Sequence, residues 1–272
     1  IPITVEIIEL FKELDVPIKD RQALVNWLQA AQTPGGRFDT ETRYNQMFAE
    51  RHPVDEVGKD IQYHHPLITG TRSYSEVEET AHAVRALKLL GSEPGDKAAT
   101  IKWLQDLQHP EGFFSGKRYP DYWQISEDGL DPATMSAEQL AEYTFSDQLT
   151  DTYWAVMALE DLATRPRDAE TCRNWLKGAV AVTWALDKSK WVIAWEHLEA
   201  LYLLGGRLPD EEKWIEEARH DKGISGIATA IYSGHRFEID RLERSFIVPT
   251  MQSLRLLDVL GGLDEEFLAK VK

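Results

Sequence analysis

Apolar residues recur along most of the chain at spacings of three and four, which is the period of an amphipathic helix. The same stretches are rich in Ala and Leu, two residues that favour the helical conformation. No stretch shows the sustained alternation of apolar and polar residues that is typical of a strand. The pattern therefore predicts an all-α protein.

Two kinds of helix alternate in this pattern. Helices of the first kind are apolar nearly all round, as expected of an inner layer, and are predicted at about 3–14, 77–90, 150–162, 192–204 and 246–260. Helices of the second kind are more charged on one side, as an outer layer should be, and are predicted at about 19–32, 96–108, 168–182, 210–219 and 263–271. The chain is thus expected to form five helical hairpins.

The hairpins carry an internal repeat. The segment Trp27–Gln32 recurs as Trp103–Gln108, and each copy is followed by Pro, Gly and an aromatic residue. A second series interleaves with the first, because Thr80–Gly91 is similar to Thr152–Leu162, to Glu199–Gly205 and to Leu254–Gly261. A fixed repeat of this kind is the signature of an array of identical structural units.

These two motifs together resemble the repeat of the prenyltransferase and squalene-cyclase superfamily, the terpenoid cyclase-like toroids. The segment Gln108–Phe114 is similar to the Gln–Trp motif of that superfamily, with Phe in place of Trp. The resemblance implies an α/α toroid of about five to six hairpins, in which inner helices surround a cavity and outer helices wrap them. It also implies one domain over 1–272, with a sixth hairpin supplied from elsewhere if the ring has six.

The connections between hairpins indicate where a site should lie. Links from inner to outer helices are short, whereas links from outer to inner helices are long, at about 33–76 and 110–149. Long loops in a compact domain are usually functional. We therefore expect two lid-like loops over the N-terminal ends of the inner helices.

Charge and composition exclude several classes of partner. The chain has 46 acidic and 30 basic residues, a net charge of −16, which argues against a nucleic-acid partner and against docking on an anionic membrane. No apolar run approaches the roughly 20 residues that span a bilayer. We expect a soluble, cytoplasmic protein without an integral membrane segment, whose oligomeric state the sequence leaves open.

The resemblance does not bring a mechanism with it. The Asp-x-Asp-Asp motif of proton-initiated cyclases and the Asp-Asp-x-x-Asp motif of diphosphate-ionising cyclases are both missing from the sequence. The nearest match to the zinc ligands of protein prenyltransferases, Asp151–Tyr153, lacks the cysteine. No cofactor or metal ligand is therefore predicted. Binding of Mg²⁺ is expected only if the substrate is a diphosphate.

Four residues are candidate catalytic groups on the predicted inner helices: Asp147, Asp151, Glu196 and His82. Asp147 and Asp151 fall near the expected start of the third inner helix, where a carboxylate can cap free N–H groups and interact with the helix dipole. A buried carboxyl in aromatic surroundings can instead act as an acid. Glu196 has His197 beside it as a group that could orient it or relay a proton.

Several substrate-binding candidates lie on the side of an inner helix that is expected to face the central cavity. Glu78, His82 and Arg85 lie on one such stripe, although they could equally be structural pairs at helical spacing. Aromatic side chains on these helices could stabilise a cationic state of the substrate, or they could serve only to pack the core. Arg72 and Arg118 could hold an anionic head group near inner-helix N-termini. The aromatic candidates are Tyr153, Trp154, Trp191 and Trp195.

Three functions remain open at this point. The first is an enzyme on an isoprenoid or other largely apolar substrate, working by acid-initiated cyclisation, isomerisation or addition, as the resemblance suggests. The second is a carbohydrate-active hydrolase or lyase, for which Tyr119, Tyr122 and Trp123 beside Asp121 would suit a sugar cleft. The third is a non-catalytic toroid that binds an apolar ligand or a protein partner.

Overall fold

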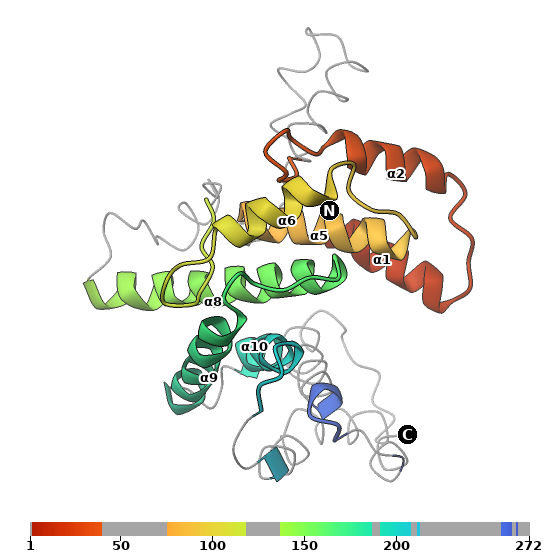
Figure 1. Ribbon diagram of the computed structural model, residues 1–272. Helices are drawn as coiled ribbons and strands as arrows, with labels where there is room; N and C mark the ends of the chain where they lie inside the picture. The colour runs from red at the N-terminus through yellow and green to blue at the C-terminus, as the bar shows by residue number, and fades with distance from the viewer. Residues whose placement is uncertain are drawn as a thin grey trace, which may run out of the picture. The chain divides into compact units, whose positions relative to one another are not determined.

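The computed structural model describes residues 2–39, 75–117, 137–186, 191–207, 211–212, 257–262 and 265 (Figure 1). Its helices are α1 (Pro2–Glu13), α2 (Arg21–Ala30), α5 (Glu76–Leu89), α6 (Lys97–Asp106), α8 (Ala137–Asp161), α9 (Ala169–Leu186) and α10 (Trp191–Leu203). The described residues contain isolated β-bridges but no strand. The predicted all-α class is confirmed.

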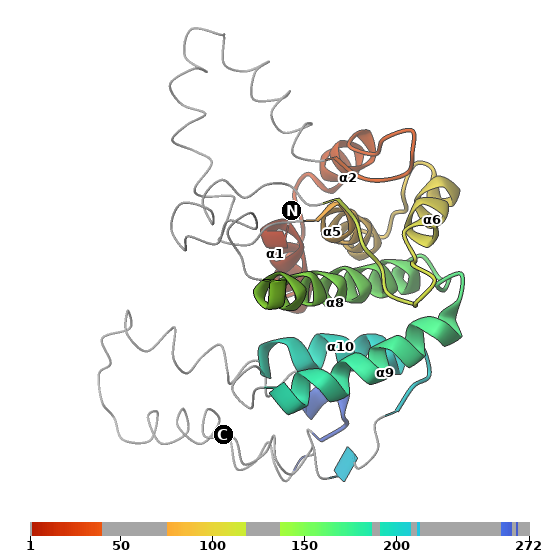
Figure 2. The same ribbon diagram turned by 90° about the vertical axis from the view of Figure 1, so that its left-hand side faces the viewer.

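Chain contacts divide the protein into two compact units, Ile1–Asp168 and Ala169–Lys272. In the first unit, α5 packs against both α1 and α8, while α2 contacts α5 and α6 contacts α8. Both ribbon views show α5 between α2 and α8 (Figures 1 and 2). In the second unit, α9 packs against α10.

The two predicted layers differ in burial as expected. Helix α5 buries ten of its fourteen residues, whereas α6 buries only Thr100 and Leu104. An inner helix needs this broad burial because it has neighbours on several sides, and an outer helix needs only a narrow apolar stripe. The distinction between apolar inner helices and one-sided outer helices is therefore confirmed for this hairpin.

Five inner helices end in the same turn. The second residue after each helix has a positive φ: Asp15 at 51°, Gly91 at 63°, Ala163 at 57°, Gly205 at 76° and Gly261 at 70°. In the second hairpin, for example, the Ser92 N–H donates to the Leu87 carbonyl at 2.8 Å across this turn. Such a left-handed turn satisfies carbonyls that the helix end leaves open. The fifth copy, at 257–262, confirms an inner-helix end near residue 260.

A second repeated structure joins each hairpin to the next, and we call it the glutamine clamp. Gln32 accepts from the Asp96 N–H at 2.8 Å and donates to the Asp96 carbonyl at 2.8 Å. Gln108 makes the same pair of bonds with Asp168, at 2.9 and 2.7 Å. Because Asp96 is the N-cap residue of α6, the first clamp fixes the start of α6 to the end of α2.

The turn after each clamp is also repeated. A bridge joins Gln32 to Phe38, and another joins Gln108 to Phe114. The turn in the first copy depends on Gly36, which has a φ of +93°. A Cβ atom at this position would lie only 2.3 Å from the carbonyl carbon of Ala99. A side chain there would collide with the backbone of α6, so the glycine permits the close approach of two hairpins.

One predicted boundary is wrong. Helix α8 begins at Ala137, so the second long connection does not extend to residue 149. The segment 137–149 is rich in Ala, Glu, Gln and Leu, without Pro or Gly, and this helix propensity extends α8 N-terminally beyond the repeated motif. Asp147 and Asp151 consequently lie well inside α8, and the proposed capping of a helix N-terminus by these carboxylates is also wrong.

Candidate functional site

The candidate site lies where α5 and α8 face each other. His82 on α5 and Trp154 on α8 occupy equivalent positions in the Ala–Leu repeat. Their ring centroids are 4.2 Å apart, with an angle of 51° between the planes. Equivalent positions on neighbouring inner helices therefore lie side by side, as the alignment of the repeats predicts.

Glu78 and His82 form a close pair on α5. Glu78 Oε1 lies 3.7 Å from His82 Nε2, one helical turn away, and both side chains are nearly buried. Ser75 caps this helix, because its Oγ accepts the Glu78 N–H at 3.0 Å. The carboxylate thus sits in the first turn of a capped helix, where the dipole favours negative charge.

The second ring nitrogen of His82 has nothing to bond to in the described part of the chain. Nδ1 is buried there without a hydrogen-bond partner. A buried polar atom is normally paired, and an unpaired one calls for an explanation. A ligand that binds next to His82 and carries a donor or acceptor would provide one.

Aromatic rings complete this group of residues. Tyr153 is buried, and its ring meets that of Trp154 edge-on, with centroids 4.8 Å apart and an interplanar angle of 62°. Trp154 itself is only partly buried. The rings of Trp154 and His82 and the Glu78 carboxyl therefore form one contiguous cluster, which we call the α5–α8 cluster.

Asp151 belongs to the repeated turn. Its side chain is 1% exposed, and Oδ2 accepts the Gly116 N–H at 2.9 Å. Its neighbour Thr152 holds the same turn, because Oγ1 accepts the Phe114 N–H at 2.9 Å, and Thr80 does so for Phe38 at 3.1 Å. These contacts give Asp151 a positioning role in the turn between hairpins. Asp147, one turn earlier on α8, is partly buried.

Arg85 lies away from this cluster, toward the C-terminal end of α5. Its guanidinium donates to Asp161 Oδ1 at 3.1 Å and to Glu9 Oε1 at 3.3 Å. Burial opposes the charged form, but the two carboxylates outweigh it and raise the pKa of Arg85 above its usual value. Arg85 therefore ties α1, α5 and α8 together, and the structural interpretation of this residue is favoured.

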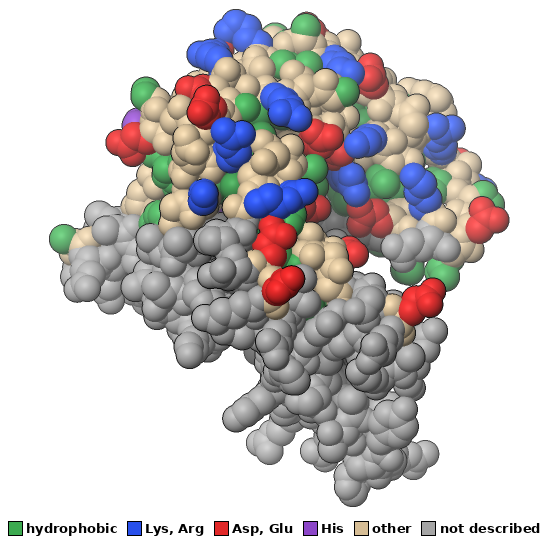
Figure 3. All heavy atoms as spheres, turned by 60° about the horizontal axis from the view of Figure 1, so that its bottom comes forward, with side chains coloured by type: hydrophobic (Ala, Val, Ile, Leu, Met, Phe, Trp, Pro, Cys, Tyr) green, Lys and Arg blue, Asp and Glu red, His purple; other side chains and the backbone are tan. Residues whose placement is uncertain are grey.

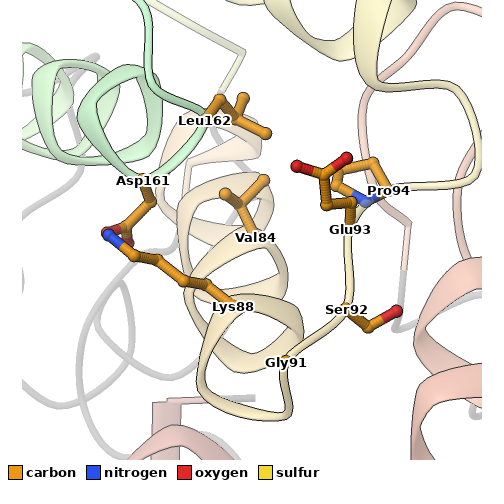
Figure 4. Close-up of a pocket in the computed structure, with 8 residues that line it drawn as sticks. All are labelled: Val84, Lys88, Gly91, Ser92, Glu93, Pro94, Asp161 and Leu162. Atoms are coloured by element: carbon orange, nitrogen blue, oxygen red, sulfur yellow. The ribbon is translucent and has the colours of Figure 1, made fainter.

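The same end of α5 has a pocket of about 300 Å³. Figure 4 shows Val84 and Leu162 on its apolar side, with the Lys88 amino group beside the Asp161 carboxylate. Lys88 Nζ and Asp161 Oδ1 are 2.7 Å apart. Because the charges are already paired, this pocket presents little unsatisfied chemistry. Sequence reasoning did not single out Asp161, although its charge at an apolar repeat position was a signal.

His197 is fully buried on α10, and neither ring nitrogen has a partner among the described residues. Burial lowers its pKa from the ordinary 6.5 to about 3, so the ring is neutral at physiological pH. Its repeat equivalents are the buried Ala83 and Ala155. This placement favours packing over proton relay.

The remaining candidates fall outside what the structure describes. Arg72 and Arg118 lie outside the described residues. Trp191, Trp195 and Glu196 lie on α10, but their side chains are not among those described. The anion-binding and cation-stabilising roles of these residues stay predictions.

On the face that Figure 3 shows, the coloured side chains do not gather charge of one sign. Acidic and basic side chains alternate there, with hydrophobic groups between them. Several charged side chains of the described residues are paired, for example Asp106, which contacts Lys102 and Arg167. Among the described helices, none is both long enough and apolar enough to cross a membrane.

The comparisons with known families agree with this architecture. The model of the prenyltransferase alpha-alpha toroid domain matches residues 4–122 and again residues 71–179, together more than half of the chain. The two matches overlap on the second hairpin, as an internal repeat requires. The chain is therefore a member of the prenyltransferase alpha-alpha toroid domain family, with the all-α toroid fold that defines it.

Membership also connects the chain, at a coarse level, with prenyl and terpenoid enzymes and with binding of isoprenoid substrates. Neither a comparison with curated proteins nor one with solved structures finds a significant match. The reaction and the substrate must therefore be argued from the α5–α8 cluster itself.

Proposed function

We propose that this protein is an enzyme that acts on an isoprenoid or other largely apolar substrate by acid-initiated cyclisation, isomerisation or addition. The observation that carries the proposal is the α5–α8 cluster, in which a nearly buried carboxyl–imidazole pair lies against aromatic rings. Acid, base and cation-stabilising surface then lie within a few side chains of one another. Family membership supports the substrate class.

The proposed reaction begins with a proton from the Glu78 carboxyl in its neutral form. The helix dipole opposes that form, and exclusion of water by an apolar substrate over this nearly buried group would have to favour it. The Oε–H bond breaks, the proton adds to one carbon of a substrate double bond, and a carbocation forms at the other carbon. Cyclisation is attack on that cation by a second double bond of the substrate. His82 then removes a proton from a neighbouring carbon, which restores an alkene and leaves an imidazolium. Transfer of that proton to Glu78, 3.7 Å away, regenerates both groups.

Trp154 would steady the positive charge during this sequence. An aromatic face stabilises a desolvated cation by roughly 0.5–2 kcal/mol. Its ring lies beside His82, and the edge-on contact with Tyr153 holds it in place. The carbocation and His82, the base that removes its proton, would then lie next to each other.

The direct test is product formation in heavy water. The protein is incubated in D₂O with geranyl, farnesyl and geranylgeranyl diphosphates and with squalene, with and without Mg²⁺, and the extract is analysed by mass spectrometry. A cyclised or isomerised product that carries one deuterium from solvent is expected without metal. A product that forms only with Mg²⁺ and carries no deuterium would contradict acid initiation. Absence of product with every substrate would refute the function in this form.

A further inference from the structure

A short backbone segment links α8 to α5 next to the α5–α8 cluster, and we call it the strap. It consists of residues 114–117, which follow the second clamp turn. On its α8 side, the Gly116 N–H donates to Asp151 Oδ2 at 2.9 Å. On its α5 side, the Lys117 carbonyl accepts the Glu76 N–H at 2.9 Å. The attachments to the two helices therefore fall on adjacent residues of the strap.

The strap packs closely on the start of α5. A Cβ atom at Gly116 would lie 2.6 Å from Val77 Cγ2 and 3.5 Å from the Val77 backbone nitrogen. Glycine at this position therefore lets the strap approach the helix. At the other end of the strap, Phe114 is fully buried, and its N–H donates to Thr152 Oγ1. The strap is thus held by α8 on one side and lies against α5 on the other.

The part of α5 that the strap contacts is the turn that carries the proposed acid, Glu78. The N–H groups of the first helical turn have no acceptor within the helix and need one from outside it. Ser75 Oγ accepts the Glu78 N–H at 3.0 Å, and the strap accepts the Glu76 N–H. Without the strap, the first turn would lose one of these acceptors, and the backbone that carries Glu78 would be less firmly held.

The internal repeat indicates that the acid at position 151 serves the strap. A buried carboxyl such as that of Asp151 is costly unless its oxygens are bonded. Its equivalent on α5 is Glu79, which follows the first clamp turn and is also buried. The equivalents in the next two predicted inner helices are Ile193 and Pro249, and the segments before them, 169–190 and 205–245, contain no glutamine for a clamp. In these hairpins the acid thus occurs together with the clamp turn.

We propose that Asp151 is a positioning residue for the reaction. Through the strap, it holds the first turn of α5 and thereby keeps the Glu78 carboxyl in place beside His82 and Trp154. Asp151 acts on the acid through the backbone and donates no proton to the substrate. The inference rests on the proposed function, because it gives Asp151 a task only if Glu78 is the acid.

A positioning role of this kind affects the chemical step more than substrate binding. Proton transfer depends on the exact place of the acid, and a displacement of about 1 Å costs roughly 10²-fold in rate. The proposed aromatic contacts of the substrate, Tyr153 and Trp154, lie on α8 itself and keep their place when the strap moves. Loss of the strap's attachment is therefore expected to lower kcat and to leave KM nearly unchanged.

Hydrogen exchange tests the link between Asp151 and α5 without any turnover. Exchange in residues 75–84 is followed by mass spectrometry in the native protein, Asp151→Ala, Asp151→Asn and the control Gln108→Ala. The first turn of α5 should exchange roughly tenfold faster in Asp151→Ala, because the turn opens locally. Asp151→Asn should stay close to native, since its amide oxygen accepts the same N–H. Gln108→Ala removes two bonds to Asp168 from the same clamp turn and should leave α5 unchanged.

Steady-state kinetics of the same variants test the consequence for the reaction. The substrate is whichever of the isoprenoid diphosphates or squalene the native protein converts, and circular dichroism confirms that each variant is folded at the assay temperature. Asp151→Ala should lower kcat by roughly 10–10²-fold, with KM within about twofold of native. Asp151→Asn should restore kcat to within about threefold of native, because the acceptor is kept. Gln108→Ala should keep the native kcat.

Each part of the experiment has a result that would overturn the proposal. Native exchange of α5 in Asp151→Ala would show that the strap does not hold the first turn. Equal losses of kcat in Asp151→Ala and Gln108→Ala would reduce the effect to general destabilisation. Native kcat in Asp151→Ala, with activity lost in Glu78→Gln, would reject the positioning role and leave the proposed function standing. Absence of turnover in the native protein would refute the proposed function, and the positioning role with it.

Discussion

The turn that ends each inner helix depends on the backbone conformation of a single residue. Its left-handed position holds Gly in three hairpins but Asp15 and Ala163 in the other two. For a residue with a Cβ atom, the left-handed conformation costs roughly 1 kcal/mol. In the sequence, three of the repeated segments end in glycine, at Gly91, Gly205 and Gly261, which favours this turn. The non-glycine members could not be predicted, because nothing in Asp or Ala marks a positive φ.

Ala163→Gly should therefore stabilise the protein by about 0.5–1 kcal/mol, because it relieves the positive φ of 57°. Urea unfolding measures the change. The matched opposite substitution is Gly91→Ala, which should destabilise, since a Cβ there lies 2.7 Å from Arg21 Nη2 at φ +63°. A loss of stability in Ala163→Gly would show that the turn is not strained.

Buried His197 should make stability depend on pH. Its pKa is about 3 in the folded protein and about 6.5 when unfolded, so the unfolded chain binds the proton more tightly. Stability should fall as pH drops below 6.5, by up to about 1.4 kcal/mol per unit, until the folded pKa is reached. Urea unfolding between about pH 7 and pH 5 should show this extra slope in the native protein and a smaller one in His197→Leu. Equal slopes would mean that His197 is solvated.

At the scale of elements, helix type and order were predictable and long-range contacts were not. Apolar periodicity predicted the inner and outer helices. A helix that is buried on all sides has apolar residues on every face, whereas a helix that is buried on one side has them on one face only. The early start of α8 was missed, since the helix was placed by its repeated motif and the helix propensity of residues 137–149 was not used. The glutamine clamps were seen as a repeated motif, but their bonds join residues 60 or more apart and cannot be read from spacing.

The clamps should contribute measurably to the packing of successive hairpins. Gln108→Ala removes two hydrogen bonds to Asp168 and should destabilise the protein by about 1–2 kcal/mol, as measured by urea unfolding. Gln22→Ala is the matched control, because Gln22 is exposed and its side chain donates only within α2, to Asn26 at 2.8 Å. Equal effects of the two substitutions would remove any special role for the clamp.

At the scale of the whole molecule, the repeat predicted the family, and the family match confirmed it. The site was predictable in part. The alignment of inner helices placed His82 beside Trp154, and the contact between their rings agrees with it. Glu78 followed from the helix stripe, but as a substrate-binding residue and not as the acid. The roles of Asp147 and Asp151 did not follow, because they depend on where α8 begins and on a turn contributed by Gly116.

The α5–α8 cluster as the source of acid and base is the central claim, and variant turnover tests it most directly. The rate of product formation in D₂O is compared for the native protein, Glu78→Gln, His82→Ala and the control Glu93→Gln, an exposed carboxylate on the α5–α6 turn. Loss of general acid–base catalysis predicts a fall of roughly 10²–10⁴-fold for the first two variants. The control should keep full activity, and circular dichroism should show intact folds. Unchanged turnover in Glu78→Gln and His82→Ala would contradict the account.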